Sequence, residues 1–200
     1  MVSLSFLSSS TKRPLWQGQL LVVLCVVVFS LLGIGTRTSE YLASFWGTNA
    51  VMLGLLLRNP HWGRDWRTWA YAYAAYALTD WLMGTAPFWA FGMAAANELG
   101  VAVGWWLFMR KPRRVRELQQ SHSVLELLQA CLVAALASAA VGGALSWMRF
   151  EIPWWQAYVM WAVSEFAAFI LTVPVFLVAC GRGAVGGQTS PWIGTTPCRW

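Results

Sequence analysis

Charged side chains are scarce in this chain. Lysine, arginine, aspartate and glutamate make up 11% of its 200 residues, whereas an average soluble domain carries about 25%. Hydrophobic residues account for 58%, and long apolar runs recur from Gln17 to Cys180. This composition excludes an ordinary soluble domain and indicates an all-α, polytopic transmembrane helical bundle that has the lipid bilayer as its solvent.

Cysteine and histidine are also few. The four cysteines form no CxxC pair, so we expect neither a disulfide framework nor a metal site. The two histidines, His61 and His122, lie in polar connectors away from the acidic residues of the apolar runs. HExxH, GxSxG and P-loop patterns are absent from the sequence. We therefore expect no catalytic residues, no metal and no cofactor, and we interpret the chain as a protein that is not an enzyme.

Six apolar segments stand between polar or proline-containing connectors. We place spans at about 17–36, 41–57, 68–86, 88–109, 124–147 and 154–180. No A-x-A-like cleavage site follows the first of them, so it is interpreted as an uncleaved span. The predicted organisation is a cytoplasmic tail at 1–16, one integral membrane domain at 17–180, and a glycine-rich cytoplasmic tail at 181–200 that we expect to be disordered.

Basic residues separate sharply between the two sides of this topology. With the N-terminus inside, the outer loops hold only Arg37 and Arg149. The cytoplasmic segments hold the other twelve: Lys12, Arg13, Arg58, Arg64, Arg67, Arg110, Lys111, Arg113, Arg114, Arg116, Arg182 and Arg199. This asymmetry predicts six spans with both termini cytoplasmic. It also accounts for the net charge of +6 without a nucleic-acid partner.

Several acidic and amide side chains interrupt the apolar spans. A carboxylate at the centre of a bilayer costs roughly 2.5–3.5 kcal/mol on insertion scales. At about 1.5 Å of rise per residue, all of these residues fall in the outer half of the membrane or near its midplane. The set comprises Asn49, Asp80, Asn97, Glu98 and Glu165.

Helical spacing gives these polar residues aromatic neighbours. Trp46 and Asn49 share one stripe, Trp161 and Glu165 share another, and Asp80 continues a stripe of tyrosines. Aromatic walls with a few polar groups are typical of small-molecule sites. We therefore predict a pocket lined by the five polar residues with Trp46 and Trp161 as walls. The alternative is that the carboxyl groups serve only as interhelical hydrogen-bonding groups, kept neutral by desolvation.

Small residues supply close packing. Gly100 and Gly104 form a GxxxG pair, and the fifth span is rich in alanine, serine and glycine. Such pairs let helix backbones approach closely in lipid. We favour packing within the bundle over dimerisation.

Three stretches of the chain carry motifs in a characteristic order. They are FWGTNAVMLGLLLR at 45–58, AAANE at 94–98 followed by Arg110 and Lys111, and Trp161 and Glu165 followed by TVPVFL at 172–177. In this order and spacing they resemble the bacterial membrane-associated sensor domain of the first type, the MASE family. The chain departs from the family pattern at Gly47 or Thr48, where proline is common, and at Glu165, where aspartate is usual.

The resemblance implies an integral membrane sensory domain of the bacterial inner membrane. Such domains usually precede diguanylate cyclase, phosphodiesterase, PAS or histidine-kinase modules and take part in cyclic di-GMP and related signalling. The family often has about eight spans, so six would correspond to a truncated member or a stand-alone form. We expect a small, unidentified ligand and a cytoplasmic output module, of cyclase or kinase type, outside this chain. A substrate-binding subunit of a small-molecule transporter is the alternative.

Overall fold

The computed structural model describes residues 14–36, 46–112 and 122–178. Residues 181–200 and most of the predicted N-terminal tail lie outside these ranges. Within them every regular element of secondary structure is a helix, which confirms the predicted all-α class. The helices are α1 (Leu15–Gly35), α2 (Thr48–Arg58), α3 (Pro60–Gly63), α4 (Trp66–Leu82), α5 (Pro87–Met109), α7 (Ser123–Phe150) and α8 (Trp154–Val178).

Three of these helices, α1, α7 and α8, are long and apolar enough to cross a membrane. The helix α5, with 23 residues, reaches the length of about 20 residues that a span needs, and α4, with 17, approaches it. The membrane character of the bundle follows from these helices, whereas the number of six spans stays a prediction.

Proline and a capping aspartate set several helix boundaries. Pro60 and Pro87 stand at the first positions of α3 and α5, where a missing N–H is harmless. Asp65 caps α4, because its Oδ1 accepts a hydrogen bond from the backbone N–H of Arg67 at 3.0 Å. These boundaries agree with the predicted connectors within a few residues.

The second predicted span differs from the structure. Its helix begins at Thr48, and Trp46 and Gly47 are not helical. Residues 41–45 lie outside the described ranges. The 11 residues of α2 rise roughly 16 Å, about half the thickness of a hydrocarbon core. The described helix α2 is therefore too short to cross a membrane by itself.

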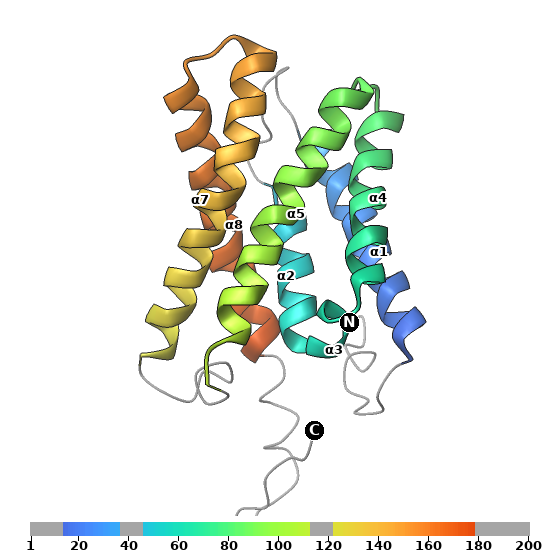
Figure 1. Cartoon of the computed structure of the whole chain (residues 1–200), viewed down its shortest axis with the longest axis vertical. Coiled ribbons are helices and arrows are strands. Elements are labelled where there is room, and N and C mark those ends of the chain that lie inside the picture. The colour runs from blue at the N-terminus through green and yellow to red at the C-terminus, as the bar shows by residue number, and fades with distance from the viewer. Residues whose placement is uncertain (1–13, 37–45, 113–121, 179–200) are drawn as a thin grey trace, which may run out of the picture.

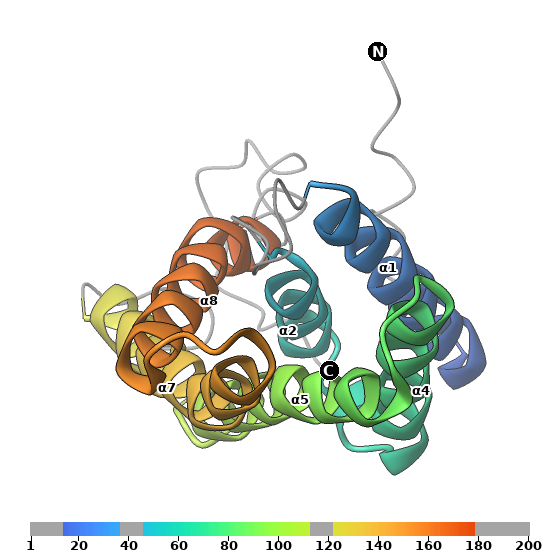
Figure 2. The ribbon, with the colours of Figure 1, turned by 90° about the horizontal axis from the view of Figure 1, so that it is seen from above.

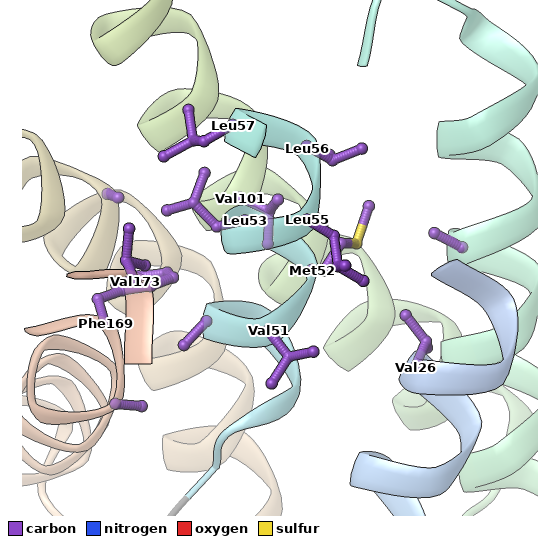
Figure 3. Close-up of a cluster of buried hydrophobic side chains, with 14 of the residues drawn as sticks. Val26, Val51, Met52, Leu53, Leu55, Leu56, Leu57, Val101, Phe169 and Val173 are labelled. Carbon is purple, nitrogen blue, oxygen red and sulfur yellow. The ribbon is translucent and has the colours of Figure 1, made fainter. Parts of the chain in front are cut away.

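The short helix α2 lies at the centre of the bundle. Figure 2 shows it enclosed by α1, α4, α5 and α8, with α7 packed outside against α5 and α8. All residues from Thr48 to Leu57 are buried. In Figure 3, side chains of α2 such as Leu53 and Met52 lie among those of neighbouring helices, including Val26 of α1 and Val173 of α8. A helix that is apolar on all sides is suited to this position.

Successive helices run in alternating directions, so their connectors gather at two ends (Figure 1). At one end, Gln19 of α1 donates a hydrogen bond to Asp65 at 3.0 Å, and Trp69 of α4 stacks edge-on with Trp105 of α5. Arg58 is the last residue of α2, Arg64 follows α3, and Arg67 stands in the first turn of α4, so these basic residues belong to this end, hereafter the basic end. Arg149 lies in the last turn of α7, at the other end. This arrangement is compatible with the predicted charge asymmetry, although which end is cytoplasmic stays a prediction.

The two glycines of the GxxxG pair pack against other helices of the same chain. A Cβ placed on Gly100 would lie 2.8 Å from Cβ of Ser138, and one on Gly104 would lie 3.2 Å from Cβ of Ala134. Both glycines therefore let α5 lie close to α7. This is packing within the bundle, which we favoured from the sequence.

We expect Gly100→Val to lower the thermal midpoint of the purified protein by several degrees, because the added methyl groups must displace Ser138. Gly35→Val is the control, since a Cβ at Gly35 meets nothing within 4 Å. Light scattering should show the same mass for both variants and the wild type. A lower mass for Gly100→Val with an unchanged midpoint would instead place the pair between two copies.

Candidate ligand-binding site

Asn49 is the centre of a buried hydrogen-bonded cluster. Its Nδ2 donates to Oδ1 of Asn97 at 3.0 Å and to Oε1 of Glu165 at 2.7 Å. Its Oδ1 accepts from the hydroxyl of Tyr76 at 2.7 Å. These four residues, which we call the Asn49 cluster, are each at most 2% exposed.

The cluster joins four helices at one point. Asn49 lies in the first turn of α2, and Tyr76, Asn97 and Glu165 come from α4, α5 and α8 respectively. Because α2 begins only at Thr48, within the buried part of the bundle, its first turn lies among these three helices. The late start of α2 thus places one amide where it contacts three neighbouring helices.

Tyr76 was not among the predicted site residues, although the sequence carried a signal for it. Tyr76 lies four residues before Asp80 on the stripe of α4 that was recognised, and a buried tyrosine hydroxyl usually finds a polar partner. In the structure this side chain is 1% exposed and its hydroxyl also approaches the sulfur of Met52, at 3.9 Å. Tyr76 therefore replaces the predicted tryptophan Trp46 as the aromatic neighbour of Asn49.

Glu98 lies beside the cluster rather than in it. It follows Asn97 on α5, is partly buried, and interacts electrostatically with Tyr76, as Glu165 does. Its Oε1 is buried and accepts no hydrogen bond from any described residue. Asp80 is buried one helical turn beyond Tyr76 on α4.

The two predicted tryptophan walls have different surroundings. Trp46 precedes α2, so the predicted helical stripe from Trp46 to Asn49 is wrong; its indole covers Gly33 of α1. Trp161 lies one turn before Glu165 on α8, and its Nε1 donates to the hydroxyl of Ser138 at 2.8 Å. Its ring covers Gly142 of α7. Trp161 thus fixes the part of α8 that carries Glu165.

The donor hydrogens of Asn49 and Tyr76 are all engaged within the cluster. Asn49 uses both hydrogens of its amide, and Tyr76 uses its single hydroxyl hydrogen. The second carboxyl oxygen of Glu165, Oε2, is buried and has no hydrogen-bond partner among the described residues. A buried acceptor without a donor is costly, so a donor supplied from outside the chain would be stabilised here.

Comparison with known proteins agrees with the motifs. The chain matches the MASE1 family model over residues 17–182. It is 26% identical over 181 residues to a protein of Escherichia coli O157:H7 named Probable diguanylate cyclase DgcF. That match covers 88% of this chain and 38% of the relative.

No solved structure matches the chain significantly. The family match covers most of the sequence and includes every helix of the described bundle apart from the first two residues of α1. It ends at residue 182, beyond the last residue of α8. The chain therefore belongs to the MASE1 family of membrane-associated sensor domains.

Proposed function

We propose that this chain senses a small ligand inside the bacterial inner membrane and passes the signal to a cytoplasmic output module. The Asn49 cluster is the proposed sensing site. The observation that carries the proposal is that one buried amide, on a helix of half the span length, links α4, α5 and α8. Ionisable groups at such depth are rare and usually functional.

The helix α2 offers a route for the signal. Its first turn holds Asn49, and its last residue is followed at once by α3 at the basic end. There Trp62 of α3 covers Gly18 of α1, and the indole N–H of Trp69 donates to the backbone oxygen of Gly63 at 2.8 Å. A ligand that binds one arrangement of the cluster more tightly would shift α2, and this displacement would reach the basic end.

The output module that we propose is a diguanylate cyclase. The relative that matches this chain is named as a probable diguanylate cyclase, and the match covers 38% of the length of that relative. A sensor region joined to a larger remainder is the arrangement expected if the membrane bundle regulates a separate domain. We propose the same relation for this chain, either within a longer polypeptide or with a partner protein.

A single-atom change tests the site. In a fusion of this chain to a diguanylate cyclase domain, we expect Tyr76→Phe to change cyclic di-GMP output about fivefold, because one buried hydrogen bond contributes roughly 1 kcal/mol to the balance of two states. Tyr73→Phe is the matched control on the same helix. Its hydroxyl donates to the backbone oxygen of Phe91 at 3.1 Å in an exposed position.

Membrane levels of both variants should be measured by immunoblot, so that output is compared per molecule. Equal output from Tyr76→Phe, Tyr73→Phe and the wild type at equal levels would reject the cluster as the sensing site.

A further inference from the structure

Several buried oxygens in and beside the Asn49 cluster have no hydrogen-bond partner among the described residues. The hydrogens of the Asn49 amide and of the Tyr76 hydroxyl are all engaged. Two carboxyl oxygens nearby, Oε2 of Glu165 and Oε1 of Glu98, are buried without a partner in the described part of the chain. The hydroxyl of Thr48, the neighbour of Asn49 in sequence, can both donate and accept, and it too is buried without a partner in the part of the chain that the structure describes.

Positive charge is distant from the cluster. Among the described residues, every lysine and arginine lies at an end of a helix or in a connector: Arg58, Arg64, Arg67, Arg110, Lys111 and Arg149. The carboxyl group of Glu165 is therefore not paired with a basic side chain of the described bundle. Among the residues that the structure describes, the Asn49 amide is the hydrogen-bond donor to its Oε1.

An anionic ligand fits this environment poorly. The N-terminal end of α2 carries a partial positive charge that attracts anions. The Glu165 carboxyl group already lies at the first turn of α2, where its Oε1 accepts from the side-chain amide of Asn49. An added anion would meet Glu165 and Glu98 at close range and in a medium of low dielectric constant, where like charges repel strongly.

We propose that the ligand of the Asn49 cluster is a small monovalent cation, bound mainly by Oε2 of Glu165. An alkali metal ion and a primary ammonium group share this chemistry, since both interact with carboxyl and hydroxyl oxygens. The described residues contain no group of three or more acidic, histidine or cysteine side chains that could hold a metal ion together. The inference is therefore limited to a single positive charge, and it rests on the proposed sensing function of the same site.

Thermal unfolding of the full chain in lipid nanodiscs tests the inference. The probes are sodium, potassium and methylammonium chloride, each compared with choline chloride at the same ionic strength. Choline is the reference because it is larger than the other three cations and its quaternary nitrogen has no N–H to donate. We expect at least one small cation to raise the midpoint by about 5 °C at saturation. A response to sodium or potassium indicates a metal ion, and a response to methylammonium alone indicates an amine.

Two variants locate the response. Glu165→Gln keeps the shape and the oxygen that accepts from Asn49 but removes the charge, so the shift should vanish. Glu126→Gln is the control, because Glu126 forms an ion pair with Lys111 at the basic end. If Glu165→Gln does not accumulate in the membrane, Glu165→Asp is used in its place. This variant shortens the side chain by one methylene and so moves the carboxyl group away from the site. The concentration for half of the maximal shift should then rise about tenfold, as expected for a weakened charged contact.

Three outcomes would overturn the inference. They are equal midpoints in all four salts, an equal shift in Glu165→Gln, and an unchanged half-maximal concentration in Glu165→Asp. The first would mean that the cluster holds only a proton or a water molecule. The sensing function has its own readout, because an effect of Tyr76→Phe on cyclic di-GMP output would stand even if no cation bound.

Discussion

Replacement of Asn49 by alanine should lower the free energy of unfolding by about 3 kcal/mol, because three interhelical hydrogen bonds are lost together. The variant leaves Glu165, Asn97 and Tyr76 buried without their common partner. Removing one member of a buried network costs more than one average hydrogen bond, since each group left behind is desolvated. The measurement is an unfolding titration with denaturing detergent, followed by tryptophan fluorescence.

Asn59→Ala is the matched control. Asn59 ends α2, and its Nδ2 makes one local hydrogen bond, to the backbone oxygen of Leu55 at 3.1 Å. We expect this change to cost about 1 kcal/mol or less. The double variant Asn49→Ala with Glu165→Leu should lose less than the sum of the two single losses, because the interaction between the two residues is counted twice in the sum. Strict additivity would contradict the hydrogen bond from Asn49 to Glu165.

The second large effect is expected at Gly142. The indole of Trp161 lies directly against this glycine, so a side chain at position 142 would overlap the ring. Gly142→Leu should therefore lower the free energy of unfolding by about 3 kcal/mol, or prevent accumulation in the membrane. It should also shift the fluorescence spectrum, since Trp161 is 8% exposed and donates to Ser138.

Ala144→Leu provides the control on the same helix. Ala144 is exposed on the surface of α7, two residues beyond Gly142, and a leucine there can face lipid. The variant should unfold within about 0.5 kcal/mol of the wild type. If Gly142→Leu were equally well tolerated, the close contact between α7 and α8 at Trp161 would be refuted.

Much of the candidate site was accessible from the sequence. A polar residue within an apolar run is conspicuous, because its burial in lipid is costly, and Asn49, Asn97 and Glu165 were identified on that ground. The structure brings these three together. Tyr76 was recognised as part of the aromatic stripe of Asp80 but was not included among the site residues, because a tyrosine hydroxyl gives no such contrast in composition.

Other features depended on where the helices begin and how they pack against one another. From the sequence we predicted a helix that included Trp46, because the residues around Trp46 permit a helix. None of them prevents the helix from beginning before Thr48. Likewise Glu98 and Asn97 are neighbours in sequence, but only Asn97 belongs to the hydrogen-bonded cluster. Adjacent residues on a helix point about 100° apart, so the packing of α5 decides which of them faces α2.

The sequence by itself determined that this protein is a helical membrane bundle with costly polar groups in its interior. Composition and periodicity suffice for this, because they indicate whether a segment is surrounded by lipid or by water. Only the tertiary structure decided that Asn49, Tyr76, Asn97 and Glu165 meet at one point around a half-length helix. Their meeting depends on helix ends and interhelical packing, which arise from contacts between segments far apart in the chain.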